Sequence, residues 1–219
     1  MRAARALASV VVLSSTLWAP GGAARPRPPA PVVDPAGLVE LARLGGEAAS
    51  IRLDLRYATA DNFTHRTVYP QARCLLRREV AVRLMAVEAR LRARGLHLKL
   101  YDCYRPLSVQ RLFFQLVPDE RYVADPKKGS RHNRGAAVDL TLVDEAGREL
   151  PMGTGFDDFS ARAHRDATGL PEEVVRNRAL LDEVMGAAGF TGMPTEWWHY
   201  DGPGWERYPL LDVPMQAVR

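Results

Sequence analysis

Apolar and polar residues alternate in several short stretches of the chain, and each such stretch predicts a β-strand. Residues 50–57 (SIRLDLRY) place apolar side chains at every second position, so these side chains share one face. Residues 96–102 (LHLKLYD) alternate in the same way, and residues 136–142 (AAVDLTL) are strand-like. Residues 196–200 (EWWHY) are short and aromatic, which favours a further strand.

A second period, in which apolar residues return after three or four positions, predicts helices. It runs through residues 74–94 and ends at Gly95. Pro106 suits the first turn of another helix that continues through QRLFFQLV, and residues 172–188 form a third, closed by Gly189. Strands and helices alternate irregularly, and no glycine-rich turn leads from a strand into a helix. We therefore predict a single α+β domain.

The composition limits what this domain can do. With 219 residues, 47% hydrophobic and 26% charged, the chain can bury one sizeable core and is unlike a disordered, collagen-like or coiled-coil protein. Its net charge of +4 is mild and no block of like charges occurs, so the composition gives no support to nucleic-acid binding. Two cysteines cannot build a disulfide framework or a cysteine zinc ribbon. A small-molecule or peptide substrate fits best.

The N-terminus has the pattern of a secretory signal peptide, which we place at residues 1–24. Two arginines precede an uncharged run at residues 6–18, and small residues follow up to Ala24. The run is shorter than the roughly 20 residues that a membrane-spanning helix needs, although an uncleaved anchor is the alternative. The proline-rich residues 25–36 form a leader before the domain at 37–219. We predict export to the periplasm or extracellular space, with no stable membrane insertion after cleavage.

Two short motifs hold residues with the chemistry of a metal site. His132 and Asp139 lie in SRHNRGAAVD, and Glu196 and His199 lie in EWWH. Two imidazoles and one carboxylate form the three-ligand set of a catalytic zinc site, whose fourth position is left for water. A second carboxylate close by can then take the proton from that water. The spacing alone does not say which acidic residue is the ligand.

The strand predicted for EWWHY complicates this interpretation. Glu196 and His199 are three positions apart, which puts them on one face of a helix but on opposite faces of a strand, unless a bulge or turn intervenes. The other histidines have no acidic partner in a recognisable frame, and we interpret them as structural. They are His65, His97 and His164.

Four motifs together resemble the D-alanyl-D-alanine dipeptidases, the VanX type of zinc D-Ala-D-Ala peptidases. In chain order they are YATADNFT, DCYRP, SRHNRGAAVDLTL and EWWHY, and the similarity runs from about Leu53 to Tyr200. The wider group of zinc D,D-carboxypeptidases shares the S-x-H-x-x-G-x-A-x-D and E-x-x-H pieces, whereas YATADNF and the double tryptophan are typical of the dipeptidase branch. The resemblance implies a compact α+β domain of the Hedgehog-like type, with a central antiparallel sheet flanked by helices.

The resemblance also implies roles for individual residues. His132, Asp139 and His199 correspond to the family's zinc ligands, which hold one zinc ion per chain. Glu196 corresponds to the catalytic base. Arg105, in DCYRP, matches the arginine that stabilises the oxyanion formed from the substrate's carbonyl group.

Three further residues correspond to the family's substrate pocket. Asp157, in PMGTGFDD, falls where the family places a carboxylate for the substrate's ammonium group, and Tyr57 and Ser130 match positions that line the dipeptide pocket. Two of these assignments have simpler alternatives. Arg105 could be a surface arginine that pairs with Asp102, and Asp157 could be a turn or cap residue.

The implied activity is hydrolysis of the D-alanyl-D-alanine dipeptide to two D-alanines by a zinc-activated water. Two alternatives remain: a zinc D,D-carboxypeptidase that cuts peptidoglycan stem peptides, and a catalytically silent, zinc-containing wall-binding module. An intact Glu196 argues against the module, since binding needs no base. The family's vancomycin-resistance enzymes destroy a dipeptide made in the cytosol, so we expect an exported protein to act on dipeptide from wall turnover or the surroundings. The oligomeric state stays open.

The two cysteines, Cys74 and Cys103, are interpreted as a disulfide because export is expected. Such a bond would lie two residues from Arg105, and two buried free thiols are the alternative. The adjacent Trp197 and Trp198 alternate on the predicted strand, so one is expected in the core and the other in the wall of the pocket.

Overall fold

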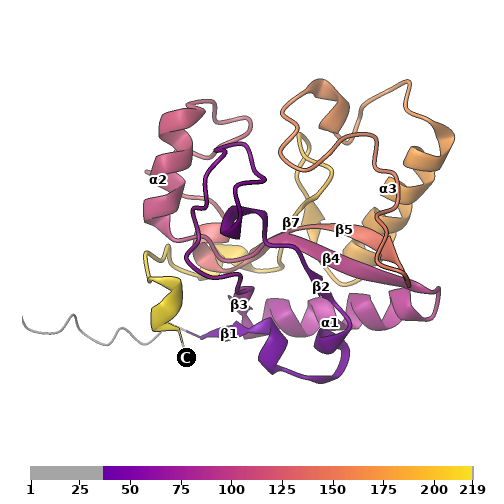
Figure 1. The fold of residues 1–219 in the computed structure, drawn as a ribbon, viewed down its shortest axis with the longest axis horizontal. Coiled ribbons are helices and arrows are strands. Elements are labelled where there is room, and N and C mark those ends of the chain that lie inside the picture. Colours follow the sequence, from indigo (N-terminus) through magenta and orange to yellow (C-terminus); the bar gives the residue numbers. More distant parts are fainter. Residues whose placement is uncertain (1–36, 219) are drawn as a thin grey trace, which may run out of the picture. The chain divides into compact units, whose positions relative to one another are not determined.

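A five-stranded sheet lies at the centre of the structure, a computed structural model that describes residues 37–218 (Figure 1). The signal peptide and the proline-rich leader expected from the sequence lie outside the described residues. Neighbouring strands follow the order β2–β4–β5–β7–β6. In that order, their bounds are Arg52–Leu53, Leu96–Asp102, Ala137–Asp144, His199–Asp201 and Thr191–Gly192.

This central sheet is largely antiparallel. Every neighbouring pair runs antiparallel except β2 and β4, which run parallel. A separate two-stranded sheet pairs β1 (Leu38–Glu40) with β3 (Leu75–Arg77). The predicted α+β class with a central antiparallel sheet is therefore confirmed. The parallel edge strand could not be foreseen from alternation, because side chains alternate with the same period in both kinds of strand.

The described residues form three α-helices, two of which pack against the central sheet (Figure 1). One of them, α1 (Arg78–Arg92), lies along the sheet and buries Val80, Leu84, Val87 and Leu91 completely. Burying one such side chain contributes about 1.5–3 kcal/mol, so this stripe fixes α1 on the core. The other two helices are α2 (Leu107–Leu116) and α3 (Glu172–Gly186). Within the described part of the chain, no helix has the length and apolar character needed to cross a membrane.

One predicted strand is much shorter than expected. The alternation at residues 50–57 yields only the two-residue β2, after which the chain turns into a short 3-10 helix at Arg56–Ala58. Ile51 and Leu55 are buried, but Leu53 is 40% exposed, so the predicted common apolar face is wrong. Because β2 is the edge of the sheet, a longer strand there would have a partner on one side only.

The helix predicted over residues 74–94 begins later, at Arg78. Its first residues form β3 instead, and Leu75 and Leu76 are fully buried there. A short apolar run fits either a buried strand or a helix, and the pairing with β1 decides between them. The remaining predicted helices, and the strands β4 and β5, agree with the structure to within two residues at each end.

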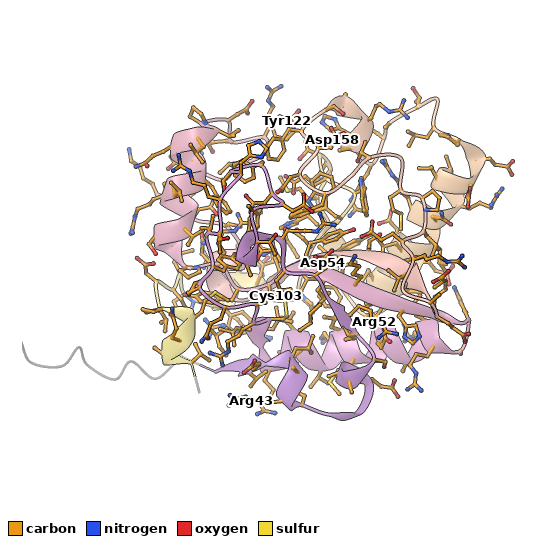
Figure 2. All side chains as sticks on the ribbon, viewed as in Figure 1. Arg43, Arg52, Asp54, Cys103, Tyr122 and Asp158 are labelled. Atoms are coloured by element: carbon orange, nitrogen blue, oxygen red, sulfur yellow. A yellow bond between two sulfur atoms is a disulfide. The ribbon has the colours of Figure 1, made fainter. Side chains whose placement is uncertain are left out.

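The two cysteines meet at the boundary between the two sheets. Their sulfur atoms, in Cys74 and Cys103, lie 2.11 Å apart, and their Cα atoms are 5.3 Å apart. Cys74 precedes β3 and Cys103 follows β4, so the pair links the two-stranded sheet to one end of the central sheet. Figure 2 shows Cys103 in the middle of the molecule, and both cysteines are buried.

Candidate active site

Strand register brings three polar side chains into one row across the central sheet. Asp139 on β5 lies opposite His199 on β7, and on its other side it lies opposite Asp102 at the end of β4. All three are buried, the most exposed being His199 at 6%. Residues directly opposite in a sheet have Cβ atoms about 4.5–5.5 Å apart, so their side chains meet on one face. Strand pairing, rather than closeness in sequence, therefore builds this row.

His132 reaches the same place from a loop. It begins a single 3-10 turn, His132–Arg134, which ends at Gly135 in the left-handed conformation with φ +67°. A Cβ atom at Gly135 would overlap the side chain of Leu38, so both the backbone angle and the close packing require glycine. This turn buries His132 beside Asp139 and explains the glycine three residues after the histidine.

Hydrogen bonds fix which nitrogens of the two imidazoles carry protons. Nδ1 of His132 donates to the carbonyl of Cys103 at 2.7 Å, and Nε2 of His199 donates to the carboxylate of Asp201 at 2.9 Å. The opposite nitrogens, Nε2 of His132 and Nδ1 of His199, are the ones that a metal ion could bind, and they lie 3.1 Å apart. Oδ1 of Asp139 is 3.3 Å from the first nitrogen and 3.0 Å from the second.

Three electron-rich atoms that converge in this way repel one another unless a cation lies among them. A tetrahedral zinc ion with ligands at about 2.0–2.1 Å separates neighbouring ligand atoms by about 3.3–3.4 Å, close to the observed spacing. Burial lowers the pKa of His199, but hydrogen bonds to Asp139 and Asp201 outweigh burial and raise that pKa to about 10, which favours a proton on Nδ1 at the position that a bound metal cation would take. The site therefore attracts positive charge, and the donors of His132, Asp139 and His199 fit zinc.

A turn, rather than a strand, brings Glu196 beside these donors. The predicted strand at 196–200 begins only at His199, and the preceding residues form turns in which the N–H of His199 donates to the carbonyl of Glu196 at 3.4 Å. The Glu196 carboxylate lies 4.0 Å from Nδ1 of His199. The turn thus resolves the conflict between a three-residue spacing and the two faces of a strand. Burial raises the pKa of Glu196 above its ordinary value.

Arg105 is buried, with 8% of its surface exposed, so it is not a surface arginine. Its Nε and Nη2 donate to Oδ2 of Asp102 at 3.1 and 2.8 Å, and Nη1 donates to Gln110 at 2.9 Å. The rings of Tyr57 and Phe113 lie 5.3 and 4.8 Å from its Cζ. Burial lowers the pKa of the guanidinium, but the charge of Asp102 more than offsets this, so Arg105 stays charged. Arg105 therefore pairs with Asp102 and at the same time lines the cavity.

Asp157 lies in the loop between β5 and α3, with a backbone φ of +60° that few residues other than glycine adopt. Its Oδ1 accepts a hydrogen bond from the Tyr57 hydroxyl at 3.0 Å, and its Oδ2 accepts one from the backbone N–H of Phe63 at 3.5 Å. Burial raises the pKa of Asp157 to about 7, although the bond from Tyr57 lowers it. A cationic ligand would stabilise the charged form of this carboxyl group.

The eight site residues predicted from the sequence line a single cavity. They are Tyr57, Arg105, Ser130, His132, Asp139, Asp157, Glu196 and His199. The cavity holds about 80 Å³, which is small beside the roughly 300–1,000 Å³ of pockets for drug-sized ligands. Ser130 accepts the backbone N–H of His132 on its hydroxyl oxygen at 3.2 Å, so the hydroxyl hydrogen can turn toward a ligand. A small polar molecule is the ligand that this space can hold.

Aromatic side chains complete the wall of the cavity. They are Phe63, Phe113, Tyr122, Phe159 and Trp198. The rings of Tyr122 and Phe159 lie 5.2 Å apart, and Figure 2 shows Tyr122 near the upper end of the molecule. Both tryptophans of EWWHY are buried, but only Trp198 lines this cavity, while the indole of Trp197 donates to Thr154 at 2.8 Å. Their different surroundings come from the turn and not from alternation along a strand.

Two residues that support the site were not predicted for that role. Asp201 orients His199, and the H-x-D spacing on a strand, which puts both side chains on one face, could have revealed it. Tyr69 donates to Oδ1 of Asp102 at 2.8 Å, so it helps to hold the carboxylate that pairs with Arg105. No local sequence signal marks Tyr69.

The three histidines interpreted as structural lie outside the lining of this cavity. One detail differs from the expectation that they lack acidic partners. Nδ1 of His97 lies 2.7 Å from a carboxylate oxygen of the fully buried Glu88. The partner belongs to α1, nine residues earlier in the chain, and no short motif joins the two.

The sequence is similar to those of known proteins along most of its length. A family model described as D-ala-D-ala dipeptidase matches residues 34–215. The D-alanyl-D-alanine dipeptidase of Escherichia coli is 42% identical over 172 residues, which cover 78% of this chain and 89% of that protein. The D-alanyl-D-alanine dipeptidase of Enterococcus faecalis is 32% identical, and the match covers 68% of this chain and 85% of that protein. That of Streptomyces coelicolor is 35% identical, and the match covers 69% of this chain and 86% of that protein.

A comparison with solved structures gave a weaker likeness. The zinc complex of the vancomycin resistance D,D-pentapeptidase VanY overlaps 63% of this chain and 78% of its own, with a TM-score of 0.38 and 19% identity, too low to bear on the fold. The family match, in contrast, spans the whole segment from Tyr57 to His199 that lines the cavity. On that match and on the identity to its relatives, the chain belongs to the D-ala-D-ala dipeptidase family.

Proposed function

We propose that this protein is a zinc-dependent D-alanyl-D-alanine dipeptidase, which hydrolyses the dipeptide to two D-alanines. One observation carries the proposal: a single small cavity is lined by a two-histidine, one-aspartate metal site, by an adjacent carboxylate, and by a further carboxylate suited to an ammonium group. A relative that bears this name is 42% identical over most of the chain.

His132, Asp139 and His199 would hold the metal, and a bound zinc ion would supply a water molecule that can lose a proton near neutral pH. The carbonyl of Cys103 and the carboxylate of Asp201 keep the two imidazoles in the tautomers that turn lone pairs toward the ion. Such outer partners typically change metal affinity or activity about 10- to 100-fold when removed.

Glu196 is the general base. Its carboxylate lies 4.0 Å from Nδ1 of His199, beside the metal ligands but not among them. It takes the proton of the attacking water and delivers it to the nitrogen of the leaving D-alanine. Burial raises the pKa of Glu196, which strengthens it as a base and keeps the proton available for the second transfer.

Arg105 stabilises the negative charge that develops on the carbonyl oxygen of the scissile amide. Of the five N–H groups of a guanidinium, three donate to Asp102 and Gln110, so two are left for the substrate. The same contacts hold the guanidinium rigidly, and a preorganised donor of this kind contributes roughly 2.7–4 kcal/mol.

Asp157 and Tyr57 recognise the free amino end of the dipeptide. The carboxylate of Asp157 pairs with the ammonium group, and the Tyr57 hydroxyl holds the carboxylate in place. An acylated nitrogen carries no charge, so it would leave the half-buried carboxylate of Asp157 without a cationic partner, which costs free energy. The same residue therefore excludes peptidoglycan stem peptides.

The test is release of D-alanine from D-Ala-D-Ala and from N-acetyl-D-Ala-D-Ala, with protein whose bound zinc has been measured. We expect cleavage of the free dipeptide only, its loss with a chelator and its return with added zinc. Cleavage of the acetylated substrate would make the protein a D,D-carboxypeptidase. Cleavage of neither substrate by zinc-loaded protein would favour a wall-binding module.

We further propose that the protein is exported and that Cys74 and Cys103 are oxidised outside the cytosol. The N-terminal sequence pattern and the disulfide between these two cysteines support this. The substrate would then be dipeptide from wall turnover or the surroundings. Fractionation of cells that express the full chain tests it: activity confined to the cytosol, with two titratable thiols, would contradict the proposal.

A further inference from the structure

Arg165, in the loop between β5 and α3, binds the turn that carries Glu196 from behind. Its Nε donates to the carbonyl of Met193 at 2.8 Å, and its Nη2 donates to the carbonyls of Trp197 and His199, each at 3.0 Å. Its own backbone N–H donates to the carbonyl of Pro194 at 2.9 Å. One residue thus holds four carbonyl groups within seven positions of the chain.

Other segments hold the turn at single points: the N–H of Trp197 donates to the carbonyl of Ala163 at 3.1 Å, and the carbonyl of Trp198 accepts from the N–H of Leu140 at 3.0 Å. Two of its three internal backbone hydrogen bonds, from the N–H of Glu196 to the carbonyl of Met193 and from the N–H of His199 to the carbonyl of Glu196, are 3.4 Å long, while the third, from the N–H of Met193 to the carbonyl of His199, is 3.1 Å long. Bonds as long as the first two are weak beside the usual 2.9–3.0 Å. The bonds from Arg165 are charge-assisted and reach three carbonyl groups of the segment from one side chain, so they contribute strongly to its conformation.

Arg165 is itself anchored on the side away from the cavity. Its Nη1 donates to the carboxylate of Asp182 on α3 and, at 3.1 Å, to the hydroxyl of Tyr200, whose ring lies 4.4 Å from Cζ. A Cβ atom at Gly192 would overlap the guanidinium, so β6 approaches it closely only because residue 192 is glycine. The guanidinium therefore has one position, set by α3, β6 and β7.

We propose that Arg165 is a positioning residue of the active site, which places the carboxylate of Glu196 and the ring of His199 by holding the backbone between Met193 and His199. It touches neither the metal donors nor the cavity, so it acts through the turn. This inference rests on the proposed function, because Glu196 must act as a base for its position to matter. A displacement of about 1 Å in a catalytic group can cost about 100-fold in rate.

The experiment compares Arg165→Met and Arg165→Lys with wild type. The matched control is Arg176→Met, which removes an exposed arginine of α3 that pairs only with Glu172 among the described residues. For each protein we would measure kcat and KM for D-Ala-D-Ala, zinc affinity by competition with a chelating dye, and the melting temperature.

For Arg165→Met we expect kcat to fall about 100-fold, KM to stay within about threefold, and zinc affinity to weaken about tenfold because His199 shifts. Arg165→Lys should recover little, since a single ammonium cannot span the same acceptors. The control should match wild type. Wild-type kcat and zinc affinity in Arg165→Met would overturn the proposal, as would a loss confined to the melting temperature.

Two milder variants keep the test decisive if Arg165→Met does not fold. Asp182→Asn loosens the anchor of the guanidinium, and Gly192→Ala displaces it without removing its charge. Each should lower kcat and zinc affinity together, with KM unchanged, and unchanged values of both in folded protein would overturn the proposal. If wild-type protein cleaves no dipeptide, the proposed function fails instead, while the predicted loss of zinc affinity still tests the role of Arg165.

Discussion

Two halves of the cavity are built in different ways. In the metal half (His132, Asp139 and His199), two of the three donors rest on paired strands, where Asp139 and His199 face each other in the β5–β7 register. The substrate half (Asp157 and the loop of residues 145–171) has almost no strand pairing, apart from one isolated bridge at Glu149.

Side chains from α3 hold the loop of the substrate half. Arg178 donates to the carbonyls of Met152, Arg162 and His164 at 2.8, 2.9 and 2.9 Å, and Asn177 donates to Pro151 at 2.9 Å. The register of the strands is tied to the two-residue alternation of apolar and polar side chains, which is visible in the sequence. A loop whose backbone carbonyls are bound by side chains of a distant helix shows no such periodic pattern. The comparison teaches that strand register places two of the metal donors, whereas hydrogen bonds from side chains of α3 place the loop of the substrate half.

The largest expected effect is a loss of catalytic rate without a loss of bound metal, at a residue beside the metal half. Glu196→Gln removes the base but no ligand, so kcat for D-Ala-D-Ala should fall about 10³-fold while bound zinc stays at one ion per chain. Zinc analysis and steady-state kinetics on the same sample check this. Loss of zinc from the variant would mean that Glu196 is a ligand.

The next prediction concerns the substrate half. Asp157→Asn should raise KM for D-Ala-D-Ala on the order of 30-fold or more, because a buried charge pair with the ammonium group is lost. Its preference for the free over the N-acetylated dipeptide should shrink, and zinc affinity should not change. The exposed Asp166→Asn in the same loop is the control. An unchanged preference in Asp157→Asn would show that another residue recognises the ammonium group.

The pH dependence of KM tests the same role of Asp157, and the expected effect is smaller. Burial raises the pKa of Asp157 to about 7 in the free protein, so the carboxyl group is protonated below that pH and cannot pair with an ammonium ion. KM should therefore rise by up to about tenfold for each pH unit below 7 in wild type. In Asp157→Asn this rise should disappear. A wild-type KM that is flat from pH 5.5 to 8 would contradict the shifted pKa.

The smallest effect on activity is expected at the disulfide. Replacing both Cys74 and Cys103 by serine should lower the free energy of unfolding by about 3–4 kcal/mol and the melting temperature on the order of 10 °C. Because the Cys103 carbonyl, and not its sulfur, orients His132, kcat should fall only a few-fold at a temperature where the variant is folded. An unchanged melting temperature would show that the thiols are not cross-linked in solution.

The difference between the halves also explains what could be predicted from the sequence. Alternation located β4 and β5, and the motif residues on and beside them assemble around the cavity as expected. The turn at Glu196 was not predicted, because a short aromatic run is also typical of a strand. The buried position of Arg105, between Asp102 and two rings, depends on α2 and on the loop of Tyr57, so no local pattern could show it.

Because Asp139 and His199 face each other across two paired strands, the metal site can form only when these strands pair in the native register. These residues are 60 positions apart, so their side chains meet only after β5 and β7 have paired. A slip of one residue in β7 would turn His199 to the opposite face and leave Asp139 without its partner. A bound zinc ion would therefore favour correctly aligned chains over misaligned ones, so its binding free energy would stabilise the native alignment.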